Sequence, residues 1–152
     1  MASIEFTVQH DFSAQPQDVW QAMIDWESHG EWIPATRVEI DAGNPQAVGG
    51  EFTGYTGYGP LTLVDRMRVN QIDWHEDTSS GYCEVEKLGP VMSGTAGFTL
   101  TPTPSGDGAQ IEWFEKVTVP KVPNPLGPAI SKAGAVGFTL AMRRFAANLS
   151  NR

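Results

Sequence analysis

The stretch from Pro125 to about Leu149 constrains the fold more than any other part of the chain. It follows a run of turn-forming residues, contains few prolines, and its apolar residues recur at steps of three and four. This spacing is typical of one side of an α-helix. Because such a helix must bury its apolar side against another element, the rest of the chain has to supply a surface that covers it. The apolar positions are Leu126, Ile130, Ala133, Gly134, Gly137, Phe138, Ala141, Met142, Phe145 and Leu149.

Two glycines, Gly134 and Gly137, lie on the apolar side of this predicted helix. Glycine in a helix interior costs about 1 kcal/mol relative to alanine. Their presence on the buried side therefore indicates that another group approaches the helix closely. That group is either a neighbouring part of the protein or a bound molecule.

The residues before this helix alternate between apolar and polar, as strands do. The first strand is predicted around Ile4 to Phe12, with His10 on its apolar face. Two short helical segments are expected after it, over about 13–24 and 25–34, and Pro34 ends the second. Further strands at hairpin spacing are predicted over 37–42, 51–57, 61–70, 82–88, 92–101 and 110–119.

This order of elements predicts an α+β fold in a single domain of residues 1–152. Consecutive strands joined by short turns form an antiparallel sheet, here of about seven strands. A long sheet twists and curls, so we expect it to wrap around the apolar side of the long C-terminal helix. The two short helices after the first strand then close one end of the curved sheet.

The charge of the chain narrows its expected partners. Eighteen Asp and Glu residues against ten Lys and Arg residues give a net charge of −8. Nucleic acids and anionic membrane surfaces are bound mainly through Lys and Arg, so we expect neither as a partner. No run reaches the roughly 20 apolar residues of a membrane span, and the first residues lack the basic and apolar regions of a signal peptide. We therefore expect a cytoplasmic protein without a membrane span.

No residue pattern indicates a metal or a cofactor. Cys83 is the only cysteine, which excludes an intrachain disulfide and a cysteine-based metal site. His10, His29 and His75 do not have the spacing of metal ligands. The glycine-rich stretch 54–59 lacks the Lys-Ser/Thr pair of a phosphate-binding loop. We expect neither a metal ion nor a cofactor.

Several short segments form a further pattern along the chain. They are Ala14–Trp20, Asp25–Trp26, Trp32–Pro34, Gly49–Gly50, Gly94–Leu100 with the Pro/Ser/Gly hairpin after it, and the acidic and aromatic strand that follows. Together with the order of elements, these segments resemble the START-like superfamily with its helix-grip (Bet v 1-like) fold. Within that superfamily, the chain resembles the polyketide cyclase/dehydrase-type group of bacterial SRPBCC proteins, and the resemblance covers nearly its whole length.

The resemblance implies a deep, mostly apolar pocket between the sheet and the long helix. It does not imply one function, because this fold hosts lipid carriers, hormone receptors and aromatase/cyclases. No catalytic motif of the family transfers residue by residue to this chain. The candidate site residues are therefore chosen from their positions on the predicted elements.

Two acidic residues are predicted on apolar strand faces, Asp65 beside Met67 and Glu115 beside Trp113. A buried carboxylate must either pair or take up a proton, which raises its pKa, and such a group can act as a general acid or base. The alternatives are that a β-bulge reverses the alternation, or that the acids serve structural hydrogen bonds. His10 is a third catalytic candidate, with a satisfied core histidine as its alternative.

The expected pocket also needs apolar walls. Trp113, Phe98, Phe138 and Met142 lie on the strands and the helix that face each other. Tyrosine hydroxyls at the mouth would give a ligand one orienting hydrogen bond. The candidate ligand-binding residues are Trp113, Phe98, Phe138, Met142, Met67, Tyr55 and Tyr58.

Three functions remain open at this level. The first is binding of a small hydrophobic or aromatic molecule, such as a lipid or a polyketide-like compound, driven by burial at about 25 cal/mol per Å². The second is an aromatase/cyclase-type enzyme, in which Asp65, Glu115 or His10 moves protons on a poly-keto substrate. The third is a non-enzymatic module with a filled interior and no ligand. An internal void separates the first two from the third.

Overall fold

Seven strands form one antiparallel sheet in the order β1-β7-β6-β5-β4-β3-β2. This computed structural model describes residues 1–151, so Arg152, the last residue of the expected domain, lies outside the described residues. Strands β2 to β7 pair in sequence order, and β1 pairs with β7. The expected strand number and antiparallel pairing are confirmed. The strands are β1 (Ala2–Phe12), β2 (Thr36–Ala42), β3 (Glu51–Thr56), β4 (Leu63–His75), β5 (Ser80–Leu88), β6 (Ser93–Pro102) and β7 (Ala109–Val119).

Helices stand at the two expected places in the chain. After β1 come the α-helix α1 (Pro16–Met23) and the 3₁₀ helix η1 (Trp26–Glu31). The long C-terminal helix α2 (Gly127–Ser150) follows β7. Two single turns of 3₁₀ helix, η2 (Gly59–Leu61) and η3 (Asn124–Leu126), precede β4 and α2. No helix in residues 1–151 is long and apolar enough to cross a membrane.

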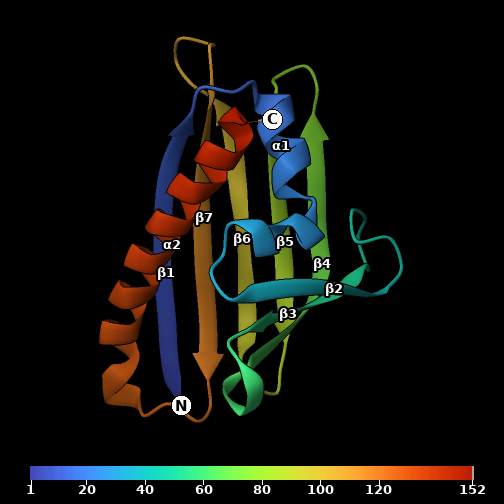
Figure 1. The fold of residues 1–152 in the computed structure, drawn as a ribbon. Coiled ribbons are helices and arrows are strands. Elements are labelled where there is room, and N and C mark those ends of the chain that lie inside the picture. Colours follow the sequence, from blue (N-terminus) through green and yellow to red (C-terminus); the bar gives the residue numbers. More distant parts are fainter. Residues whose placement is uncertain (152) are drawn as a thin grey trace.

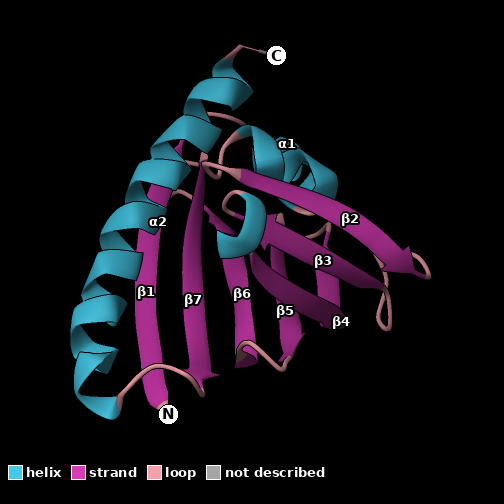
Figure 2. Cartoon of the chain, turned by 60° about the horizontal axis from the view of Figure 1, so that its bottom comes forward, coloured by secondary structure: helices cyan, strands magenta, loops and turns pink. Residues whose placement is uncertain are grey.

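The sheet is strongly curled. In Figure 1, β2 and β3 cross in front of the lower part of β4, β5 and β6, whereas α2 runs along β1 at the other edge. Figure 2 shows the same arrangement from below, with β2 and β3 curling over the rest of the sheet. Three helices cover the concave face. Helix α2 lies along β1, α1 packs through Trp20 on Trp74 of β4 and Phe98 of β6, and η1 lies against β2.

Helix α2 packs closely on β1 because glycines allow the approach. A Cβ atom at Gly134 would lie 2.7 Å from the Phe6 ring. A Cβ atom at Gly127 would lie 2.6 Å from the Ser3 carbonyl oxygen. Gly137 differs, because a Cβ atom there would meet none of the described atoms within 4 Å. The close approach predicted for this helix is therefore real at Gly134, and the approaching group is a side chain of the protein.

A β-bulge in β4 decides which side chains face inward. The register with β5 shifts between Val69 and Gln71. The alternation from Leu63 to Val69 is unaffected, so Asp65 keeps the same face as its apolar neighbours. Beyond the bulge, Trp74 turns inward and packs against Trp20 of α1, with 5.5 Å between ring centroids. The strand expected over 61–70 thus begins later and extends to His75.

Candidate ligand-binding site

A cavity of about 180 Å³ lies inside the curve of the sheet, beneath η1. This volume is far more than one water molecule requires. Of the described residues that line it, only Phe138 comes from α2, so the cavity is enclosed mainly by the sheet and η1 rather than by the long helix. Its apolar walls are formed by Trp26, Ile33, Val38, Phe52, Met67, Val85, Trp113 and Phe138.

Three charged residues also line the cavity, and we call them the charged cluster: Asp65 of β4, Lys87 of β5 and Glu115 of β7. Alternation along each strand points their side chains toward the concave face. On β6, between β5 and β7, the register places Gly94 opposite Lys87 and Ala96 opposite Glu115. Because these two residues are small, the Lys87 side chain can extend toward Glu115 across β6.

The contacts within the charged cluster centre on the Lys87 ammonium group. Its Nζ donates a hydrogen bond to Asp65 Oδ2 and lies 3.6 Å from Met67 Sδ. The same Nζ lies 3.9 Å from Glu115 Oε2, close enough for an ion pair but too far for a direct hydrogen bond. Trp113 Nε1 donates to Glu115 Oε1 at 3.3 Å. Asp65 Oδ1 is buried and has no hydrogen-bond partner among residues 1–151.

Burial and pairing act in opposite directions on the charges of this cluster. The side chains of Lys87, Glu115 and Asp65 are 6%, 14% and 18% exposed. Burial alone would lower the pKa of Lys87, but the charges of Glu115 and Asp65 and the hydrogen bond to Asp65 together raise it. Burial also raises the pKa of Glu115, and the Asp65 charge adds to this effect against the opposing Lys87 charge. Lys87 therefore stays cationic, and Glu115 has a strengthened tendency to hold a proton.

A neutral histidine lines the opposite wall. His29 of η1 is buried, and burial is the main cause that lowers its pKa to about 4. Its Nε2 lies 2.7 Å from the Met23 carbonyl oxygen. Because a carbonyl only accepts, Nε2 carries the proton, and Nδ1 is left as an acceptor. His29 therefore adds no positive charge to the cavity at neutral pH.

Five of the predicted site residues line this cavity: Asp65, Glu115, Trp113, Phe138 and Met67. Among them, the Trp113 and Phe138 rings stack with centroids 4.6 Å apart. The apolar lining and the two carboxylates thus come together in one place.

Phe98 and Met142, also predicted as ligand contacts, are fully buried in the core and do not line the cavity. Phe98 stacks against Trp113, with centroids 5.8 Å apart and an interplanar angle of 8°. It therefore supports the cavity wall without facing the void.

His10, the third catalytic candidate, lies away from the cavity. It faces its β7 partner Ile111 in the register, and its ring contacts Phe12, with 4.9 Å between centroids. Its pKa is lowered, first by burial, while the Asp11 charge raises it and the Arg143 charge lowers it. Its neighbours are thus those of a partly buried structural histidine beneath the end of α2.

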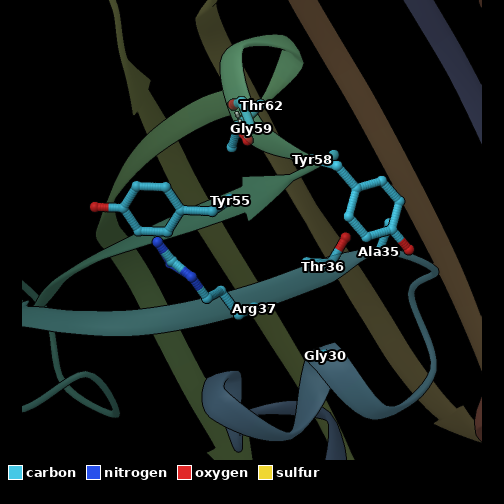
Figure 3. Close-up of a pocket in the computed structure, with 9 residues that line it drawn as sticks. Gly30, Ala35, Thr36, Arg37, Tyr55, Tyr58, Gly59 and Thr62 are labelled. Carbon is cyan, nitrogen blue, oxygen red and sulfur yellow. Dashed lines mark hydrogen bonds between the residues drawn. The ribbon is translucent and has the colours of Figure 1, made fainter.

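Tyr55 and Tyr58 lie at a separate, open depression on the outer side of β2 and β3, which we call the outer depression (Figure 3). The Arg37 guanidinium sits over the Tyr55 ring, 4.0 Å from its centroid. The Tyr58 side chain is 80% exposed. Neither tyrosine lines the cavity, although Thr36 lines both hollows. Tyr55 points outward because it alternates with Gly54 and Thr56, which face inward.

Lys87 and His29 are the two ionisable cavity residues that sequence reasoning missed. Lys87 had a usable signal, because it continues the alternation of Cys83 and Val85 along β5. His29 had none, since it lies in a 3₁₀ helix whose inward side is not marked by a simple repeat. Within residues 1–151, no group of three or more His, Cys, Asp or Glu side chains is arranged to hold a metal ion.

Comparison with known proteins identifies relatives of the whole chain. Residues 3–152 match the family model described as polyketide cyclase / dehydrase and lipid transport. None of the curated proteins compared with the chain matches it. Solved structures with similar folds do exist, and three of them come from two bacteria and a plant.

TTHA0849 from Thermus thermophilus superposes with a TM-score of 0.69 at 10% identity, over 98% of this chain and 97% of that one. CV1439 from Chromobacterium violaceum gives 0.66 at 14% identity, over 95% and 96%. Ginseng major latex-like protein 151 from Panax ginseng gives 0.64 at 12% identity, over 97% and 98%. At these identities the likeness establishes the fold alone.

Proposed function

The chain belongs to the polyketide cyclase/dehydrase and lipid transport family, with the helix-grip fold, and from this premise we propose that it binds a small hydrophobic or aromatic molecule in the internal cavity. The observation that carries the proposal is a void enclosed by aromatic and aliphatic side chains inside a closely packed domain. Interiors without a ligand-binding role have few voids larger than a water molecule. The cavity therefore argues against a module with a filled interior.

The volume of the cavity favours a compact ligand. Pockets for drug-sized molecules commonly measure about 300–1,000 Å³, and an apolar cavity of about 150 Å³ holds a benzene molecule. At about 180 Å³, this cavity suits a molecule with one or two rings better than a long acyl or poly-keto chain.

The aromatic lining supports the same ligand class. Trp113 and Phe138 form one stacked wall, and Trp26 stacks on Phe52 at 4.6 Å between centroids to form another. An aromatic ligand between such walls gains about 0.5–1.5 kcal/mol per ring pair beyond the effect of its buried area. Desolvation, at about 25 cal/mol per Å² of apolar surface, supplies most of the remaining affinity.

Leu63 marks the proposed mouth of the cavity. It lines the void, is also 41% exposed, and is the first residue of β4, two positions after η2. A ligand could pass from solvent into the cavity beside Leu63 without the unfolding of any strand. Movement of the short segment before β4 would be sufficient to widen this path.

Two measurements test the binding proposal. Native mass spectrometry of freshly purified protein should show either the mass of a complex with a co-purifying small molecule or the mass of the ligand-free chain. In the second case, the chain should form a complex with an added small molecule. Titration with naphthalene should then quench tryptophan fluorescence saturably, because Trp26 and Trp113 line the cavity. A protein that shows neither a bound mass nor saturable quenching would contradict the proposal.

A second candidate is a cyclase-type enzyme, and the buried charged cluster favours it. We propose that an ionised carboxylate, Asp65, removes a proton from a carbon between two carbonyl groups. The resulting enolate attacks a carbonyl carbon, and protonated Glu115 donates a proton to the oxygen that becomes the hydroxyl group. A Glu115→Gln variant should then keep ligand binding but lose turnover of a short poly-keto thioester. Unchanged turnover would exclude this role.

A further inference from the structure

We infer that the ligand carries an uncharged hydrogen-bond donor, such as a hydroxyl group, and no anionic group, because the polar end of the cavity has acceptors to spare and no unpaired positive charge. This inference rests on the proposed binding function and specifies the chemistry of the ligand. It follows from the charge count, the geometry of the charged cluster and the state of His29.

The charge count excludes an anion-binding role. Lys87 is the only cation among the described residues that line the cavity, and two carboxylates surround it. With both carboxylates ionised the cluster carries one net negative charge, and with one protonated it is neutral. A carboxylate or phosphate ligand would therefore be buried in a site of low polarity that offers it no unpaired cation. Burying an unpaired charge in this way is costly.

The geometry leaves room for a donor. The 3.9 Å between Lys87 Nζ and Glu115 Oε2 exceeds a hydrogen bond, so Glu115 Oε2 receives no direct hydrogen bond from Lys87. Asp65 Oδ1 also lacks a partner among residues 1–151, although it is buried. Leaving a buried acceptor without a donor is costly. A ligand hydroxyl group placed at the cluster would supply Glu115 Oε2 with the donor that Lys87 does not provide.

The Trp113 and His29 side chains do not change this balance. The Trp113 Nε1 proton is already donated to Glu115 Oε1. Neutral His29 uses its Nε2 proton on the Met23 carbonyl oxygen, so its remaining nitrogen is another acceptor. The cavity therefore offers acceptors at the charged cluster and at His29 on the opposite wall, while most of its lining is apolar.

Three probes with the same ring system test the inference: naphthalene, 1-naphthol and 1-naphthoate. Their dissociation constants are measured at pH 7 by isothermal titration calorimetry with the intact protein. We expect 1-naphthol to bind about tenfold more tightly than naphthalene, as one hydrogen bond to a charged acceptor predicts. We expect 1-naphthoate to bind more weakly than naphthalene.

A double variant, Asp65→Asn with Glu115→Gln, makes the test sharper. It leaves Lys87 as an unpaired cation in nearly unchanged space, so the preference should reverse and 1-naphthoate should become the tightest of the three probes. Glu112→Gln is the matched control, because Glu112 is exposed on the outer face of the same strand. This control should keep the wild-type order.

The outcomes separate the two proposals. Wild-type protein that binds naphthalene but binds 1-naphthoate as tightly as 1-naphthol would overturn the inference and leave the binding function intact. Wild-type protein that binds none of the probes would overturn both. Where near-ultraviolet circular dichroism shows that the double variant does not fold, Glu115→Gln alone is used. In this single variant, the affinity for 1-naphthol relative to that for 1-naphthoate must fall by about tenfold compared with wild type. An unchanged ratio would overturn the inference.

Discussion

The Lys87 ammonium group of β5 is held against the Asp65 carboxylate of β4 on the concave face of the sheet, in an ion pair whose lysine side chain is only 6% exposed. Most buried lysines are paired, because an isolated ammonium group is very costly in a low-polarity interior. Here the pair lines a cavity instead of lying in packed core. Stability and ligand chemistry therefore depend on the same residues.

Replacing Lys87 by methionine should destabilise the protein by about 3–5 kcal/mol at pH 7, because two buried carboxylates lose the only cation that lines the cavity among residues 1–151. Part of this loss should return at pH 5, where a carboxylate takes up a proton. Urea unfolding at both pH values measures the effect. Lys116→Met is the control, since Lys116 on the outer face is 64% exposed and should cost about 0–1 kcal/mol. Equal losses in the two variants would contradict the buried pairing.

The raised pKa of Glu115 predicts a stability that falls as the pH rises. The folded protein holds the Glu115 proton more tightly than the unfolded chain does. The stability that this proton contributes is therefore fully present below the pKa of the unfolded chain, about 4.3 for Glu. It is lost as the pH rises through the higher folded value. The free energy of unfolding of wild type minus that of Glu115→Gln should therefore decrease from pH 4 upward. A difference that increases over this range would show that the folded pKa is lowered.

Filling the cavity should abolish binding while the fold survives. A Cβ atom at Gly54 would lie 3.5 Å from Met67 Cε and 4.0 Å from the Asp65 carbonyl oxygen, and the flexible Met67 side chain can move aside. Gly54→Leu should therefore cost about 1–3 kcal/mol of stability and weaken naphthalene binding by more than about tenfold. Gly137→Leu makes the same exchange at an exposed helix position and should bind naphthalene normally. Undiminished binding by Gly54→Leu would place the ligand elsewhere.

The two helix glycines should respond oppositely to alanine. Gly137→Ala should stabilise the protein by about 0.5–1 kcal/mol, because it gains helix propensity and meets no described atom within 4 Å. Gly134→Ala gains the same propensity but places its methyl group 2.7 Å from the Phe6 ring, so it should be at least about 1 kcal/mol less stable than Gly137→Ala. Thermal unfolding of the two variants measures the difference. Equal stabilities would mean that the Phe6 ring moves aside freely.

The positions of Asp65 and Tyr55 illustrate how far alternation along a strand carries a prediction. Asp65 faces the cavity as its parity indicates, because the β4 bulge lies farther along, between Val69 and Gln71. Tyr55 faces the outer depression, since residues on either side of it face inward. Alternation along the strand thus predicted the face of the sheet on which each side chain lies. It did not predict whether that side chain lines the cavity or the outer depression.

The cavity itself was expected between the sheet and α2, yet η1 and the curled strands enclose most of it. Phe98 and Met142 are on the expected elements and face inward, but neighbouring side chains cover them. Whether an inward residue meets a void or another side chain depends on packing distances that residue order does not contain.

The amino-acid sequence by itself determined the type and order of the main elements and the antiparallel pairing, because these follow from local periodicity and turn residues. It also indicated the buried side of α2 at Ala141, Met142 and Phe145, but Ala133 and Gly137 of the same predicted side are exposed. Only the tertiary structure decided that Asp65, Lys87 and Glu115 meet, and that η1 closes the space above them. These residues stand on three strands, and their meeting depends on register, on the small residues of β6 and on the curl of the whole sheet. Such relations arise from contacts between distant segments, which no single segment encodes.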